Sequence, residues 1–194
     1  PYCSVRVYFA PNSDSGFFTD SNGNIFTNNN GTSTSGYGFE IFGNNNNLTS
    51  NIGTSNSSYG IYLNAVSNSI LTNNTGTSNS SYALYLSNGD NNVITGQNAT
   101  GISTNSYGIY MDTNSDNNTF KDCINVTGIE GDVLLTTTSV NNTFTNCSYR
   151  TTGTNESVAA GSSLIRKWYY RANVTNTTGD GLSSVNVTFF NKTG

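Results

Sequence analysis

Three aspartates, Asp90, Asp112 and Asp116, are the side chains of this chain best placed to do chemistry. Asp90 and Asp116 hold the same position in successive copies of an internal repeat, and Asp112 lies close to Asp116 in sequence. Two carboxyl groups about 5–10 Å apart can hydrolyse a glycosidic bond, and carboxylates joined by turn carbonyls can bind calcium. Other copies carry Asn44 and Ser67 at that position, which favours the simpler interpretation that Asp replaces Asn in a structural turn. We therefore predict that the chain is not an enzyme and holds no cofactor or metal ion, with a weak calcium site at the three aspartates as the open alternative.

The composition excludes several other classes of function. The chain has no histidine, so no mechanism can use imidazole as a base or a metal ligand. The net charge is −4 and basic residues are sparse, which predicts no nucleic-acid partner. No apolar run approaches the length of a transmembrane helix, so we expect no membrane span in this chain. The chain begins at Pro1 rather than Met, and we interpret it as processed or partial. We expect Glu130 and Asp132 to be solvated.

The aspartates recur because the chain repeats itself at intervals of about 22 to 25 residues. The first block of the repeat reads GYGFEIF at 36–42, SYGIYL at 58–63, SYALYL at 81–86 and SYGIYM at 106–111. The second block reads NNNLTSN at 45–51, NSILTNN at 68–74, NNVITGQ at 91–97, NNTFKDC at 117–123 and NNTFTNC at 141–147. A unit this short holds strands and turns and cannot bury an apolar face alone, so neighbouring copies must stack.

The phases of the apolar residues predict three short strands per copy, because strand side chains alternate between faces. The first inward stack holds pairs such as Phe39/Ile41 and Leu84/Leu86. The second stack comprises Phe26, Leu48, Leu71, Ile94, Phe120 and Phe144, and the third comprises Thr32, Thr54, Thr77, Ile102 and Ile129. We therefore predict an all-β fold, a parallel β-helix of about six coils over residues 14–150. A β-sandwich is the less favoured alternative.

Asparagine, 34 of 194 residues, falls at the predicted corners between strands. One ladder comprises Gly23, Asn45, Asn68, Asn91, Asn117 and Asn141; the next comprises Asn24, Asn46, Ser69, Asn92, Asn118 and Asn142. A third comprises Asn29, Asn51, Asn74, Gln97, Cys123 and Cys147. Asn tolerates left-handed backbone angles and hydrogen-bonds locally in turns, so we predict that these residues hold the corners.

Two of the three cysteines, Cys123 and Cys147, share a phase one coil apart. Their backbones should then lie within reach of a disulfide, which would join the final two coils in an oxidising compartment. The other interpretation is that two small side chains fill the Asn ladder. Cys3 is left without an evident partner.

Tyr62, Tyr85 and Tyr110 form an outward stripe on the first strand of successive coils. A contiguous amphipathic stripe usually marks an interaction surface. It could pack against protein, stack against sugar, or lie under a loop or the C-terminal segment. Tyr37, Tyr59, Tyr82 and Tyr107 form a second ladder where each strand begins, which we interpret as structural.

Sequons for N-linked glycans are numerous, and they favour an extracellular location. Asn56 and Asn79 are the stronger candidates, because they occupy the same loop one repeat apart. The candidate sites are Asn30, Asn47, Asn56, Asn79, Asn98, Asn125, Asn155, Asn173 and Asn191.

The Y-G-I-Y-L and N-N-x-I-T-x-N strings over residues 14–148 resemble the NosD-like right-handed parallel β-helix repeats of archaeal and bacterial surface and periplasmic proteins. The resemblance implies a right-handed coil. It implies little about function, because that family includes carbohydrate-active enzymes, copper-site maturation proteins and S-layer or adhesin components. Without histidine, no copper site is carried over.

The two ends of the chain differ from the repeat. Residues 151–194 resemble the opening hairpin of an Ig-like or carboxypeptidase-regulatory-like sandwich, with strands at 164–174 and 185–190 around a turn at 176–181. A lone hairpin is marginal in water, so further strands must follow it or come from another chain. Within residues 1–13, the strand-like stretch 5–9 either caps the first coil or is exchanged with a neighbouring subunit.

Together these features predict a non-catalytic, N-glycosylated structural subunit of a cell-surface filament, sheath or S-layer. Its partners would be copies of itself, joined by strand addition or by the tyrosine stripe. The alternative is a carbohydrate-binding or polysaccharide-cleaving β-helix, for which the three aspartates are the available acids.

Overall fold

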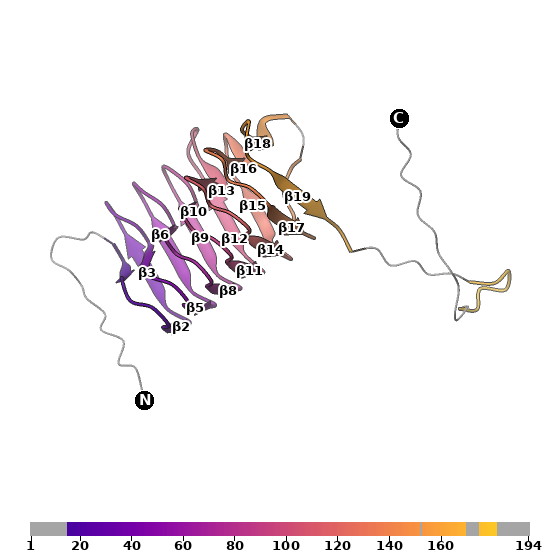
Figure 1. The fold of residues 1–194 in the computed structure, drawn as a ribbon, viewed down its shortest axis with the longest axis horizontal. Helices are drawn as coiled ribbons and strands as arrows, with labels where there is room; N and C mark the ends of the chain where they lie inside the picture. The colour runs from indigo at the N-terminus through magenta and orange to yellow at the C-terminus, as the bar shows by residue number, and fades with distance from the viewer. Residues whose placement is uncertain (1–14, 152, 170–174, 182–194) are drawn as a thin grey trace.

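The computed structural model describes residues 15–151, 153–169 and 175–181. Strands follow one another around a coil, and successive coils stack into an elongated solenoid (Figure 1). The predicted strands at 5–9 and 185–190, and the sequons at Asn173 and Asn191, lie outside the described residues. Among the described residues, no helix is long and apolar enough to cross a membrane.

The strands form three parallel sheets, each made of the equivalent strands of successive coils. Sheet A contains β1 (Phe17–Thr19), β4 (Phe39–Phe42), β7 (Ile61–Asn64), β10 (Leu84–Ser87), β13 (Tyr107–Asp112), β16 (Gly131–Leu135) and β18 (Glu156–Val158). Sheet B contains β2 (Ile25–Thr27), β5 (Asn47–Thr49), β8 (Ile70–Thr72), β11 (Val93–Thr95), β14 (Thr119–Lys121), β17 (Asn142–Thr145) and β19 (Leu164–Lys167). Sheet C contains β3 (Asn30–Ser33), β6 (Ile52–Ser55), β9 (Thr75–Ser78), β12 (Asn98–Gly101) and β15 (Ile124–Thr127). The predicted parallel β-helix is confirmed.

The core is a column of apolar side chains inside the solenoid. The first two predicted inward stacks are confirmed: pairs such as Leu84 and Leu86 on sheet A are fully buried, and so are Leu48 and Ile94 on sheet B. Each pairs in register with its counterpart one coil away, as Leu84 does with Ile61. Apolar burial of this kind is the main favourable term in folding.

The predicted third stack is wrong by one residue. On sheet C the Thr positions face outward, and Ile102 and Ile129 are 52% and 62% exposed. The inward side chains are small: Gly53 and Ser55 on β6 are buried, as are their counterparts on β3 and β9. A Cβ built on Gly53 would lie 2.3 Å from the Gly60 carbonyl oxygen, so this wall is too close to sheet A for a larger residue. Because strand side chains alternate with period two, a shift of one residue turns the whole set to the other face.

The corners are held by asparagine, as predicted. The first ladder (Gly23, Asn45, Asn68, Asn91, Asn117 and Asn141) has positive φ throughout, from 56° to 70°. In the second ladder, buried side chains bridge one coil to the next. The Asn92 Oδ1 accepts from the Ser69 backbone N–H at 2.9 Å, and the Asn92 Nδ2 donates to the Val66 carbonyl at 2.7 Å. The corner therefore satisfies backbone groups that the sheets leave unpaired.

The β-helix extends beyond the boundary predicted at residue 150. β18 pairs in parallel with β16, and β19 pairs in parallel with β17, so residues 156–158 and 164–167 belong to the solenoid. Leu164 packs partly buried against the core, which is why this segment follows the coil rather than opening a sandwich hairpin. The turn predicted at 176–181 is confirmed, with the Asn176 N–H donating to the Asp180 carbonyl at 2.9 Å.

Replacing Asn92 by alanine should destabilise the protein by about 2–4 kcal/mol, because each buried polar group left without a partner costs about 1–3 kcal/mol. Chemical unfolding measures the loss. The matched control is Asn91→Gly, one residue earlier, where the side chain is exposed and φ is 58°. Glycine accepts that angle without strain, so the control should unfold within about 0.5 kcal/mol of the wild type. Equal losses in the two variants would contradict a buried bridging role for Asn92.

Candidate functional site

Asp90 and Asp116, the pair predicted to share a phase, form part of a corner ladder. The Asp90 Oδ1 accepts from the Asp116 backbone N–H at 2.8 Å, and the Asp116 Oδ1 accepts from the Val140 N–H at 2.7 Å. Two coils earlier the Asn44 Oδ1 accepts from the Ser67 N–H at 2.7 Å in the same way. Each carboxylate therefore accepts the same backbone hydrogen bond that an Asn amide oxygen accepts at the equivalent position. This agrees with the interpretation that Asp replaces Asn in a structural turn.

Asp112 forms hydrogen bonds with other residues rather than with Asp90 or Asp116. Its Oδ2 accepts hydrogen bonds from the Tyr85 hydroxyl at 2.8 Å and the Tyr110 hydroxyl at 3.3 Å, and its Oδ1 accepts from the Thr113 hydroxyl at 3.0 Å. Among the described residues, no three His, Cys, Asp or Glu side chains gather closely enough to hold a metal ion. The three aspartates thus do not converge into the calcium site left open by the sequence.

The outer face of sheet A carries an aromatic surface that we name the tyrosine wall: Tyr37, Tyr59, Tyr82 and Tyr107 in one column and Tyr62, Tyr85 and Tyr110 in the other. The strand pairing places Tyr62, Tyr85 and Tyr110 side by side, as predicted. Their rings stack nearly parallel, with centroids 5.0 Å apart for Tyr62–Tyr85 and 4.8 Å apart for Tyr85–Tyr110. The column at the strand starts stacks in the same way, at 5.4 Å for Tyr59–Tyr82.

The two columns interlock, which the sequence reasoning missed. The Tyr59 and Tyr85 rings meet edge to face at 4.7 Å, and the Tyr82 and Tyr110 centroids are 4.4 Å apart. Tyr85 is left only 9% exposed. The sequence contained the signal for this contact, because three successive copies place tyrosines three residues apart, at 59/62, 82/85 and 107/110, with a small residue directly after the first tyrosine, such as Gly60. That small residue points inward and lets both tyrosines reach the outer face.

Comparison with known proteins gives one result. A family model described as a right-handed β-helix region matches residues 5–166. The chain belongs to this right-handed β-helix family. No curated protein and no solved structure matches it. The match ends within β19, in agreement with the boundary that the strand pairing gives for the solenoid.

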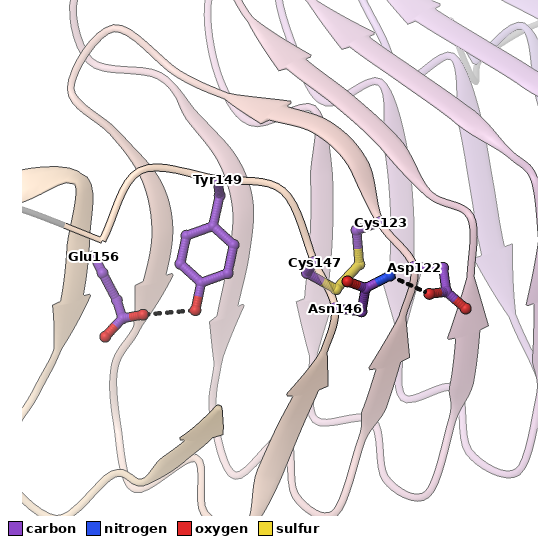
Figure 2. Close-up of a disulfide and its surroundings, with 6 residues drawn as sticks. All are labelled: Asp122, Cys123, Asn146, Cys147, Tyr149 and Glu156. Carbon is purple, nitrogen blue, oxygen red and sulfur yellow. Dashed lines mark hydrogen bonds between the residues drawn. A yellow bond between two sulfur atoms is a disulfide. The ribbon is translucent and has the colours of Figure 1, made fainter. Parts of the chain in front are cut away.

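The β-helix carries a disulfide in its last coils, between Cys123 and Cys147, whose Cα atoms are 4.3 Å apart. Figure 2 shows it beside a hydrogen bond of 2.7 Å from the Asn146 Nδ2 to the Asp122 Oδ1. An open hollow of about 510 Å³ lies alongside and is lined by Asp122, Cys123, Ile124, Asn146, Ser148, Tyr149 and Trp168. Asp122 is the one acid among these lining residues, so the hollow does not offer the paired carboxyls that glycoside hydrolysis needs.

Asp132, expected to be solvated, is fully buried. Its carboxylate accepts from the Arg150 guanidinium at 2.6 Å and from the Gly128 N–H at 3.2 Å. The hydrogen bond from Arg150 to Asp132 raises the pKa of that guanidinium. Asp132 occupies the inward-facing position that small residues such as Gly60 occupy in earlier coils. Its position in the repeat could therefore have predicted its burial. Glu130 is exposed, as expected.

The described sequons differ in accessibility. Asn30, Asn56, Asn79 and Asn125 are exposed, whereas Asn47, Asn98 and Asn155 are half-buried. Asn56 and Asn79 lie one above the other in equivalent loops of successive coils, and the Asn79 Nδ2 donates to the Asn56 Oδ1 at 2.8 Å. Asn125 is the extra residue where the register between β12 and β15 shifts. Asn30 and Asn98 lie within strands of sheet C, and Asn47 lies within a strand of sheet B.

Removing the disulfide by a Cys123→Ser/Cys147→Ser double substitution should lower the free energy of unfolding by about 3 kcal/mol, because the bridge closes a loop of 24 residues. Chemical unfolding under non-reducing conditions measures the change. The matched control is Cys3→Ser, which should unfold like the wild type. A loss caused by Cys3→Ser, with none from the double substitution, would contradict the pairing.

The tyrosine wall should resist alkali. Burial raises the pKa of Tyr59 to about 12 and raises the pKa values of the other six wall tyrosines above their ordinary value of about 10. Folding therefore favours the neutral phenols. For Tyr59 this contribution to stability is complete below about pH 10 and is lost as the pH rises through 12.

Spectrophotometric titration of phenolate absorbance tests the alkali resistance. The folded protein should ionise at higher pH than the same chain in concentrated guanidinium, and Tyr59→Phe should remove part of the late-ionising signal. Superimposable titrations of the folded and unfolded chains would show that the wall is open to water.

Proposed function

We propose that this β-helix is a non-catalytic structural subunit of an extracellular assembly, a filament, sheath or surface layer, and that its partners are copies of itself. The observation that carries the proposal is a column of outward residues on sheet B, here called the apolar column, in which four of the seven residues are exposed and apolar. In register across the seven strands, this column reads Ile25, Asn47, Ile70, Val93, Thr119, Thr143 and Ile165. Its apolar members Ile25, Ile70, Val93 and Ile165 are 69%, 49%, 37% and 43% exposed. Exposed apolar residues gathered on one face of a protein often mark an interaction site.

The periodicity of sheet B favours copies of the same chain as the partner. The outer face repeats with the coil, because a second column of Thr27, Thr49, Thr72 and Thr95 runs beside the apolar one. Neighbouring strands lie about 4.8 Å apart, so a second solenoid offers a matching period along the whole face. A partner without this period would match the column at isolated points only.

The aspartates support a scaffold rather than an enzyme. Asp90 and Asp116 each hold a backbone N–H of the next coil, as Asn44 does earlier. Proton transfer to or from a substrate would compete with these bonds. The tyrosine wall also gives little support to sugar stacking, since inner rings such as Tyr85 have their faces covered by neighbouring rings.

A glycan attached to the outer face of sheet B would block the packing of a second solenoid against that face. The sequon at Asn47 lies on sheet B among the apolar column, with Asn47 paired to Ile25 and Ile70. Asn56 and Asn79 lie in a loop after sheet C and leave that face clear. We therefore assign N-linked glycans to Asn56 and Asn79 first. An extracellular location follows from the same proposal and accords with the disulfide.

Electron microscopy of the natively isolated protein tests the proposal. We expect ordered filaments or sheets, and we expect glycopeptide mapping to find Asn47 unoccupied. An Ile70→Lys/Val93→Lys double substitution changes exposed residues on sheet B and should abolish assembly while the solenoid stays folded.

The matched control is Asp90→Asn/Asp116→Asn, which keeps an acceptor oxygen at each corner and should leave both fold and assembly unchanged. Dispersed single particles over a wide concentration range would contradict the proposal. Cleavage or binding of a polysaccharide that this control abolishes would establish the carbohydrate alternative instead.

A further inference from the structure

The tyrosine wall has a second property that an interaction surface does not require: its rings are in continuous contact. Centroid distances are 5.3 Å for Tyr37–Tyr59, 5.4 Å for Tyr59–Tyr82 and 6.2 Å for Tyr82–Tyr107. The other column adds Tyr62–Tyr85 at 5.0 Å and Tyr85–Tyr110 at 4.8 Å. An electron vacancy formed on any of these rings therefore has a neighbouring π-system in van der Waals contact.

Tyr85 lies at the centre of this array. Its ring contacts those of Tyr59, Tyr62, Tyr82 and Tyr110, at centroid distances of 4.7, 5.0, 5.7 and 4.8 Å. It is 9% exposed, the most covered ring of the wall, and the other six are half-buried. A dissolved oxidant reaches the outer rings more readily than Tyr85, so oxidation of Tyr85 must pass through its neighbours.

Tyr85 also has the proton acceptor that tyrosine oxidation requires. Loss of one electron makes a phenol strongly acidic, and the radical becomes long-lived only when its proton moves to a nearby base. The Tyr85 hydroxyl donates to the Asp112 Oδ2 at 2.8 Å, within the range over which a positioned side chain can accept a proton. Asp112 is half-buried and also accepts from the Tyr110 hydroxyl, at 3.3 Å.

We propose that the tyrosine wall is a one-electron redox site. It gives an electron to an oxidising radical at its surface, passes the vacancy from ring to ring, and holds it at Tyr85 as a neutral tyrosyl radical. In that step the Tyr85 O–H bond breaks, and a new O–H bond forms at the Asp112 Oδ2. The electron leaves through the ring stack, and the oxidant is reduced by one electron. This inference is independent of the assembly proposed above, because it needs a single folded chain.

Flash photolysis tests the redox site. Tris(bipyridine)ruthenium(III), generated by a laser flash, oxidises the folded protein, and transient absorption follows the tyrosyl radical. Asp112→Asn keeps a hydrogen-bond acceptor of the same shape but cannot take the proton. It should slow tyrosyl formation about 100-fold, at the lower end of what positioned proton transfer contributes. Tyr85→Phe keeps the ring stack and should shorten the radical's lifetime.

The matched control is Tyr149→Phe. Tyr149 also donates to a carboxylate, at 2.7 Å to the Glu156 Oε2, but among the described residues its ring contacts Phe144 rather than the wall. This variant should form the radical at the wild-type rate. Thermal unfolding verifies that each variant is folded.

A second measurement applies even if Asp112→Asn does not fold. In the wild-type protein, a solvent deuterium isotope effect on tyrosyl formation is expected, because the O–H bond breaks as the electron leaves. Absence of that effect would overturn the proposal. So would equal rates for the wild type and a folded Asp112→Asn variant, or a radical that Tyr149→Phe removes.

Discussion

The constraint on which the rest of this structure depends is the hydrogen bonding of its corners. A coil with three short strands turns sharply, and at each turn backbone N–H and C=O groups leave the sheets and are buried. Unpaired, each would cost about 1–3 kcal/mol. Stacked asparagine side chains resolve the problem, since one amide both accepts and donates. The Asn51 Oδ1 accepts from the Asn29 N–H at 2.9 Å, and its Nδ2 donates to the Phe26 carbonyl at 2.9 Å. Ladders of this kind flank sheet B, and each one holds successive coils at a fixed register.

The fixed register determines which chemistry reaches the surface. Because each coil repeats the last, an outward residue becomes a column rather than a point: tyrosine on sheet A, and alternating apolar residues and threonine on sheet B. An enzyme's active site requires a few dissimilar groups to converge, whereas this surface multiplies similar groups in lines. The columns therefore suit partners or processes that are themselves extended, such as a neighbouring solenoid or the movement of an electron along stacked rings.

The parts predictable from the sequence were those with a strong apolar period. Sheets A and B place Leu, Ile and Phe inside, so their faces and pairing followed from the spacing alone. Sheet C could not be read in this way, because its interior holds residues such as Gly53 and Ser55 while Ile52 faces outward at 43% exposure. The close approach of the backbones there, rather than hydrophobicity, selects the inward residues. The C-terminal boundary was misjudged for a related reason: Leu164–Lys167 has the outward Ile and basic residues of an edge strand, yet it pairs with β17.

The tyrosine wall was visible in the sequence as two separate ladders, but the stacking within it changes where the coil becomes longer. Successive members of the second corner ladder, which includes Ser69, are 22 or 23 residues apart up to Asn92, and Asn92 and Asn118 are 26 residues apart. Part of the added length falls between Gly101 and Tyr107, and there the Tyr82 and Tyr107 rings tilt by 56°, compared with 8° for Tyr59 and Tyr82. In the following coil Gly131 and Leu134 replace the two tyrosines. The stack therefore ends at the coil whose strand also ends in Asp112, and this coincidence places one carboxylate at the terminus of the aromatic array, against the hydroxyl of its most deeply covered ring.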